Sequence, residues 1–146
     1  MSKANTWENG LLLLAYNNTD FAGLGDAGGI RGSVAAGSIY CSLHTASAGE
    51  GGDQTTNETA YTNYVRVGVA RSGAGWTVTG NAVENAAAIT FPACGVTGAT
   101  ITHLGIGTAS SGAGKLMYEG ALTASLVVSS GITPEYAAGA LDITED

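Results

Sequence analysis

The spacing of hydrophobic positions changes near residue 38. Before that point, Thr6–Tyr16 contains four consecutive leucines and predicts a short helix, with Asn5 or Thr6 as its N-cap and Glu8 in its first turn. The leucines cover more than one helix face, so the segment needs apolar neighbours on several sides. Those neighbours belong either to a sheet of the same chain or to another subunit.

From Ile39 onward the apolar residues recur at every second position, which is typical of half-buried strands. Ile39, Cys41 and Leu43 alternate with polar residues, and Gly-, Asn- and Ser-rich turns recur every 8–12 residues. The residue ranges predicted as strands are 39–44, 64–70, 76–79, 83–91, 101–108, 115–122, 124–128 and 140–144.

About eight short strands and one helical segment predict an all-β protein, a jelly-roll-like sandwich with a short N-terminal helix or arm. Five glycines between Gly23 and Gly32 indicate a flexible connector behind the helix. We therefore expect an N-terminal apolar segment and tether at residues 1–32 and a β-sandwich domain at residues 33–146.

Composition narrows the partners of this domain. The formal net charge is −7, and the five Lys and Arg residues are scattered along the chain, which argues against nucleic acid and anionic membrane surfaces. No apolar run reaches the length of a membrane span, and no secretion signal precedes the first helix. Cys41 and Cys94 are accordingly expected to be reduced and buried.

A search for reactive motifs predicts no catalytic residue, no metal ligand and no cofactor. The loop from Ala109 to Leu116 resembles a phosphate-binding loop, but it lacks the first glycine and the hydroxyl residue after its lysine. His44 and His103 have no metal-ligand spacing, and Glu84 and Glu119 are expected to be solvated carboxylates. The sequence therefore favours a protein that is not an enzyme.

Aromatic residues on the predicted strands leave two alternatives open. They either pack against one another across strands or form a surface patch on which a sugar could stack. The residues concerned are Tyr61, Tyr64, Trp76 and Tyr118.

Several longer motifs resemble a family of small tailed-phage proteins. They are Leu43–Ala46 followed by Gly49–Glu58, Ala60–Val67, Gly75–Asn81 with Ile89–Pro92, Thr102–Thr108, Gly120–Thr123 and the Glu145–Asp146 ending. The match covers residues 39–146 and is looser before them. Members are labelled either tail-fibre-like proteins or head cement proteins, and the cement proteins have a jelly-roll fold. The resemblance thus implies a structural component of the virion.

Within this resemblance we expect capsid decoration. A fibre needs a long trimeric shaft, whereas a decoration protein needs a compact body and an apolar contact surface. The partners would be the phage major capsid protein and further copies of the chain, as a dimer or trimer, on the outer surface of a head assembled in the bacterial host cytoplasm. The alternatives are a tail-fibre or tail-associated protein and a glycan-binding module on the virion. The residues predicted to contact the capsid or other copies are Trp7, Leu11, Leu12, Leu13, Leu14, Tyr16 and Phe21.

Overall fold

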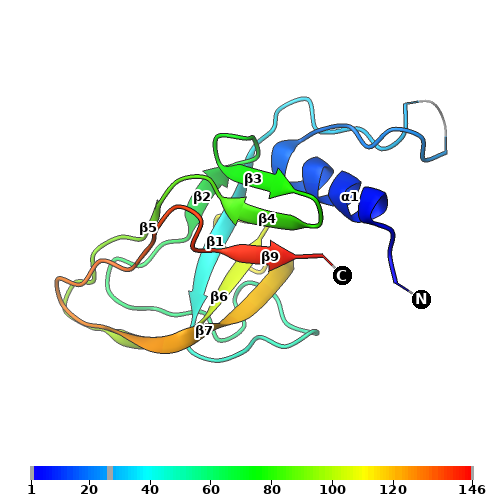
Figure 1. Ribbon diagram of the computed structural model, residues 1–146. Coiled ribbons are helices and arrows are strands. Elements are labelled where there is room, and N and C mark those ends of the chain that lie inside the picture. Colours follow the sequence, from blue (N-terminus) through cyan, green and yellow to red (C-terminus); the bar gives the residue numbers. More distant parts are fainter. Residues whose placement is uncertain (1, 26–27, 146) are drawn as a thin grey trace. The chain divides into compact units, whose positions relative to one another are not determined.

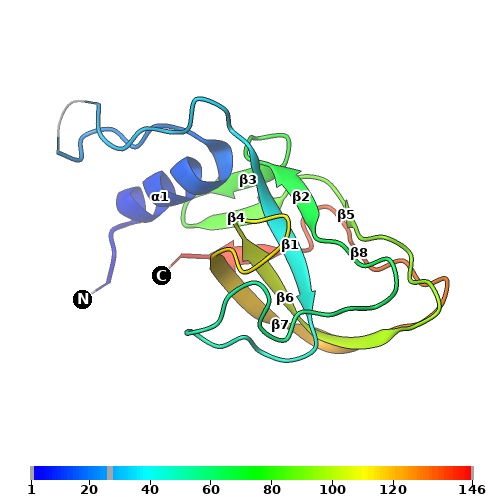
Figure 2. The same cartoon turned by 180° about the vertical axis from the view of Figure 1, so that it is seen from behind.

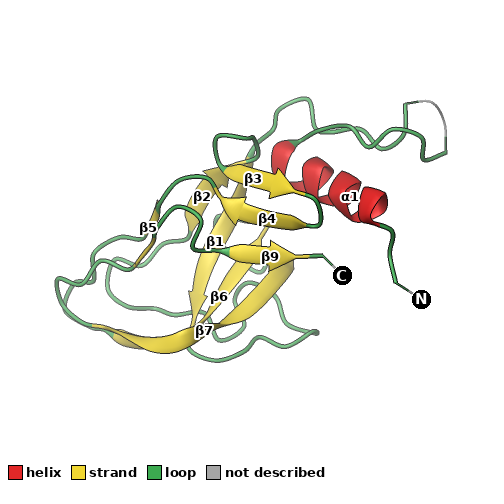
Figure 3. Ribbon diagram, viewed as in Figure 1, coloured by secondary structure: helices red, strands yellow, loops and turns green. Residues whose placement is uncertain are grey.

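The computed structural model describes residues 2–25 and 28–145 and is mostly β (Figures 1 and 3). Its elements are α1 (Asn5–Asn17), β1 (Ser38–His44), β2 (Val67–Ala70), β3 (Trp76–Thr79), β4 (Ala82–Asn85), β5 (Ile89–Thr90), β6 (Ala99–Gly107), β7 (Leu116–Val128), β8 (Glu135–Tyr136) and β9 (Asp142–Thr144). The predicted all-β class with a short N-terminal helix is confirmed. Within the described residues, no helix is long and apolar enough to cross a membrane.

The strands pair in three antiparallel sheets. One sheet has the order β2-β1-β6-β7, a second has β3-β4-β9, and β5 pairs with β8. In the first, β1 and β6 form the central pair, with Cys41 opposite Ile106 and Leu43 opposite Leu104 (Figure 2). These side chains are buried, as the alternating pattern predicts.

Two predicted strands are divided differently in the structure; in addition, β2 begins at Val67 rather than at residue 64, and β8 was not predicted. The expected strand 83–91 is interrupted because the buried Asn85 donates its side-chain amide to the carbonyls of Ala87 and Ala137 and accepts from the Leu141 N–H. The two runs expected at 115–122 and 124–128 form one strand, β7. Its register with β6 shifts between Ala121 and Leu126, which marks a bulge at the place where a separation was expected.

The described chain groups into two compact units. Unit 1 comprises residues 2–38, 69–89 and 136–145, and unit 2 comprises residues 39–68 and 90–135. The predicted boundary between residues 32 and 33 stays a prediction.

In unit 1, α1 packs on β3 and β4 (Figure 1). Leu12 and Tyr16 are buried, and the Tyr16 ring meets the Trp76 ring edge-on at a centroid distance of 4.9 Å. Ala4, rather than Asn5 or Thr6, occupies the N-cap position, and it makes no side-chain capping bond. At the other end Arg71 donates to the carbonyls of Leu14 and Ala15, which the helix itself leaves without partners.

In unit 2, a polar loop covers part of the sheet that β1, β6 and β7 form. Residues 45–59 fold back on β1, with Thr45 N–H bonded to Asn57 O and Thr59 N–H bonded to Leu43 O. Ser42 and His44, on the polar face of the alternating pattern, are therefore fully buried.

Candidate interaction surfaces

The first candidate surface is the outer side of α1 together with the segment that follows it. Trp7 is 38% exposed and its ring lies 4.9 Å from that of Phe21, centroid to centroid. Phe21 covers Gly10 so closely that a Cβ at position 10 would lie 2.7 Å from the Phe21 ring. Phe21 and Ile30 exchange backbone hydrogen bonds of 2.8 and 2.9 Å, so both are held at the helix surface. We call Trp7, Gly10, Phe21 and Ile30 the helix-side surface.

Side-chain bonds fasten the base of this segment. Asn18 pairs with Ser33 through two hydrogen bonds of 2.7 and 2.8 Å. Asp20 accepts from the Gly32 N–H at 2.8 Å and forms an ion pair with Arg31 at 3.2 Å. The flexible connector at 23–32 stays a prediction: its residues Ile30 and Gly32 are bonded to Phe21 and Asp20, and residues 26 and 27 lie outside the described part of the chain.

The predicted contact residues divide into two groups. Leu12 and Tyr16 lie in the core of unit 1, so for them the packing on a sheet of the same chain is the correct alternative. The others are exposed or half-buried: Trp7, Leu11, Leu13, Leu14 and Phe21. Their role in contacting the capsid or another copy stays a prediction.

The surface patch of four aromatic residues, one of the two alternatives left open by the sequence, does not form. Tyr61 and Trp76 are buried, and Trp76 belongs to unit 1 whereas the three tyrosines belong to unit 2. Tyr64 and Tyr118 are half-exposed, but Tyr64 packs on Tyr61 at a ring distance of 5.3 Å and Tyr118 lies beside the groove described below. Trp76 packs on Tyr16 of α1, and Tyr61 packs on Tyr64 of the same loop, so these rings take part in internal packing, although it is not the cross-strand packing that was expected as the alternative.

Unit 2 contains a buried ion pair that pattern reasoning missed. Arg66 donates to both carboxylate oxygens of Glu58 at 2.7 Å, and the two side chains are 2% and 16% exposed. The same guanidinium donates to the carbonyls of Ala109 and Gly112 at 2.9 and 2.8 Å. The bond to Glu58 raises the pKa of Arg66. One side chain thus joins the 45–59 loop to the turn after β6.

Tyr64 extends this network. Its hydroxyl donates to Glu58 at 2.8 Å and accepts from the Leu43 N–H at 3.0 Å. Burial, followed by the bond to the Glu58 carboxylate, raises the pKa of the Tyr64 hydroxyl. The motif that carries the resemblance includes Glu58, Tyr64 and Arg66, which was the only signal for this network in the sequence.

Ser42 and His44 form an arrangement that resembles part of a catalytic site. Ser42 Oγ lies 2.8 Å from His44 Nε2, and His44 Nδ1 lies 2.9 Å from the carbonyl of Thr56. Because a carbonyl only accepts, Nδ1 is the donor in that bond. Both residues are completely buried, so their geometry serves to fix residue 56 of the covering loop to β1.

The position of the Gln54 side chain explains why residue 107 in β6 is a glycine. Gln54 is completely buried, and its Oε1 accepts from the Ala109 N–H at 2.8 Å. A Cβ at Gly107 would lie 2.2 Å from Gln54 Cδ, and that is too close for any side chain. Gly107 is therefore required by packing rather than by a phosphate.

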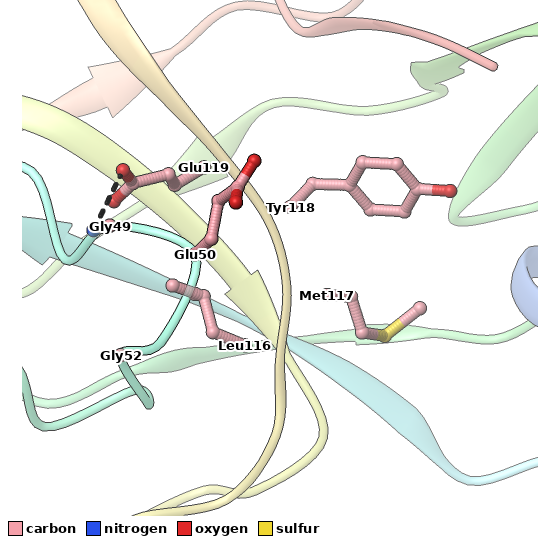
Figure 4. A pocket seen from close by; sticks show the side chains of 7 residues that line it. All are labelled: Gly49, Glu50, Gly52, Leu116, Met117, Tyr118 and Glu119. Atoms are coloured by element: carbon pink, nitrogen blue, oxygen red, sulfur yellow. Dashed lines mark hydrogen bonds between the residues drawn. The ribbon is translucent and has the colours of Figure 1, made fainter. Parts of the chain in front are cut away.

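The loop 47–52 and the start of β7 enclose an open groove of about 390 Å³ (Figure 4). Its lining is Gly49, Glu50, Gly52, Leu116, Met117, Tyr118 and Glu119. Glu119 turns toward the loop and accepts hydrogen bonds from the Ser47 hydroxyl, from Ala48 N–H at 2.7 Å and from Gly49 N–H at 3.2 Å. Burial raises the pKa of Glu119, but these bonds outweigh it and lower the pKa overall. Glu119 is therefore a loop anchor and not the freely solvated carboxylate expected.

Within the described residues, no group of three His, Cys, Asp or Glu side chains is placed to hold a metal ion. Cys41 and Cys94 are free and buried, as expected. Burial raises the pKa of the Cys41 thiol to about 12, so this side chain behaves as a small apolar residue.

These observations describe a β protein in which several large apolar side chains are exposed and the loops of unit 2 are joined by buried hydrogen bonds. Residues 29–144 match the family model described as "Podophage GP4 fiber I protein gp80". The chain belongs to this family, and it is a structural protein of a bacteriophage virion. No curated protein matches the chain.

Proposed function

We propose that the protein decorates the outside of the phage head, where it binds the major capsid protein through the helix-side surface. The observation that carries this proposal is the contact of the exposed Trp7 ring with the half-buried Phe21 ring, whose backbone is bonded to that of Ile30. Aromatic residues that are exposed yet rigidly held are enriched among the residues that dominate protein–protein binding. Repetition of one modest contact over a symmetric shell adds avidity without a tight single site.

The surroundings of the aromatic pair support contact with a protein. Asp20 and Arg31 place charges of both signs beside it, as in the polar rim of an interface. The acidic net charge disfavours nucleic acid as the partner. We propose no catalytic activity and no cofactor for this protein.

A second candidate is a fibre or tail-associated protein, because the family model carries the description of a fibre protein. In that case the helix-side surface would bind a neighbouring tail protein. The chemistry of the contact would be the same, and only the position in the virion would differ.

The two candidates are separated by fractionation of purified virions into heads and tails, followed by quantification of the protein in each fraction. Recovery with heads, together with binding of purified protein to emptied heads, is the expected result. Recovery with tails alone would reject decoration and leave the fibre candidate.

A matched pair of variants tests the surface itself. Trp7→Ala should reduce binding to heads, whereas Val34→Ala changes a fully exposed apolar residue of unit 1 outside the helix-side surface and should bind as the unmodified protein does. Equal binding by both variants would show that the helix-side surface is not the contact.

A further inference from the structure

Three loops of unit 2 are bonded to one another through their backbones. Thr62 N–H donates to Thr97 O at 2.8 Å and Gly95 N–H to Thr62 O at 2.9 Å, which joins the first loop to the second. Cys94 N–H donates to Ile132 O and Gly131 N–H to Cys94 O, both at 2.8 Å, which joins the second to the third. Figures 1 and 2 both show the orange segment after β7 running beside the light-green segment before β6. We call residues 60–65, 92–98 and 126–134 the uncharged loop cluster.

Close packing makes this cluster rigid. A Cβ at Gly95 would lie 2.6 Å from the Thr62 side chain, and a Cβ at Gly98 would lie 2.0 Å from Val128 O. Tyr61, buried beneath, donates its hydroxyl to Pro92 O at 2.9 Å. The loops therefore present their outward side chains with little conformational freedom left to lose on binding.

The outward side chains of the cluster are apolar. Val96 is 90% exposed, Val65 57% and Ile132 42%, one on each of the three loops. At the end of β7, Val127 is 67% exposed and Leu126 is 36% exposed. Five of the exposed large hydrophobic residues of the described chain thus lie on the cluster, which marks it as an interaction surface.

The cluster contains no Asp, Glu, Lys or Arg, although the chain as a whole has a net charge of −7. Two copies of an acidic protein repel each other, and the repulsion is strongest where carboxylates face carboxylates. Carboxylates flank the cluster: Glu58 is paired with Arg66, and Glu135 accepts a hydrogen bond from Thr90. A surface without charge is where two such copies can touch without opposing carboxylates.

We propose that the uncharged loop cluster is the surface through which copies of this chain associate with one another. The proposal deepens the proposed function, because it assigns self-association to unit 2 and leaves the helix-side surface of unit 1 for a different virion protein. Apolar contact between rigid loops supplies the attraction, and the absence of charge removes the repulsion.

The test is the oligomeric state of the purified protein by analytical ultracentrifugation over a concentration series. Val96→Asp places facing carboxylates in the contact and should weaken association at least about tenfold, whereas Val96→Ala removes only apolar area and should weaken it less. Val34→Asp adds the same charge on unit 1 and is the matched control, which should associate as the unmodified protein does. Because Val96 and Val34 are both exposed, circular dichroism should confirm unchanged folding in each variant.

Two results would overturn the proposal: an unmodified protein that is monomeric at about 100 µM, or equal association of the Val96→Asp and Val34→Asp variants. Neither result depends on where the virion carries the protein. Conversely, absence of the protein from purified virions, with association intact, would reject the proposed function and leave the loop cluster as a self-association surface.

Discussion

The two units are stabilised in different ways. In unit 1 the helix-side surface rests on an apolar core, where Leu12 and Tyr16 pack beneath the helix. In unit 2 the loops around the sheet are held by buried polar side chains, above all by Arg66 and Glu58. Apolar packing tolerates changes of similar volume, whereas a polar network depends on each partner. The difference predicts where single substitutions will be most costly.

The largest effect is expected from Arg66→Ala in unit 2. The substitution leaves the Glu58 carboxylate in a mostly buried position without its partner and removes two bonds to loop carbonyls. Loss of one member of a buried ion pair costs about 3–5 kcal/mol of unfolding free energy. Urea denaturation measures this loss.

Arg31→Ala is the matched control in unit 1, because its ion pair with Asp20 is exposed. Removal of an exposed pair should cost less than about 1 kcal/mol. Similar losses for the two arginines would show that unit 2 does not depend on its buried polar network.

Leu12→Ala tests the apolar side of the comparison. Leu12 lies on the buried face of α1. Removal of a buried leucine side chain lowers the free energy of unfolding by about 2–5 kcal/mol, and the loss depends on how far neighbouring atoms fill the cavity. Leu11→Ala, one residue away and only half-buried, should cost clearly less. Thermal melting of both variants makes the comparison, and equal losses would mean that the helix is not held by its buried face.

The helix and the central strand, which form through apolar packing, were largely predictable from the sequence. The leucine run predicted the helix, and the alternation around Cys41 and Leu43 predicted a central strand. Which leucine is buried was not predictable, because residues 11–14 surround the helix and only the position of β3 and β4 selects Leu12. Patterns of this kind identify an element, but the partner element decides which face it buries.

The buried polar network of unit 2 was not predictable from the sequence, because its hydrogen bonds join residues from separate loops. Arg66 reaches carbonyls at positions 109 and 112, and no periodic signal links these positions. The uncharged loop cluster was hidden for the same reason. Nothing in the sequence links its three segments, and only the backbone bonds of Thr62 to Gly95 and Thr97, and of Cys94 to Gly131 and Ile132, join them.

Gly10→Ala sharpens the description of the helix-side surface. In an exposed helix, replacement of glycine by alanine stabilises by about 1 kcal/mol. Here the added Cβ would lie 2.7 Å from the Phe21 ring, so Phe21 must move away from the helix. We expect no gain in melting temperature, together with an increase in Trp7 solvent exposure measured by fluorescence quenching. A normal gain in stability with unchanged fluorescence would show that Phe21 does not cover Gly10 in solution.

The smallest effect concerns the loop that Glu119 anchors in unit 2. Burial raises the pKa of Glu119, but the hydrogen bonds that Ser47, Ala48 and Gly49 donate to its carboxylate together outweigh burial, so the folded-state pKa lies below its ordinary value of 4.5. The folded state therefore binds its proton less readily than the unfolded state. The ionised Glu119 therefore stabilises the folded state fully at pH values above its ordinary pKa. This stabilisation is lost as the pH falls from the ordinary pKa through the lower folded-state pKa.

Glu119→Gln should remove this contribution, so that the variant is less stable than the unmodified protein at pH 7 and the difference shrinks toward pH 3. Glu50→Gln changes the same charge in the same groove and serves as the control. Melting temperatures measured between pH 3 and pH 7 compare the three proteins. Because Glu119 is partly exposed, the difference should stay well below the loss caused by Arg66→Ala. A difference that stays constant from pH 7 to pH 3 would mean that the bonds to Ser47, Ala48 and Gly49 do not depend on the charge of Glu119.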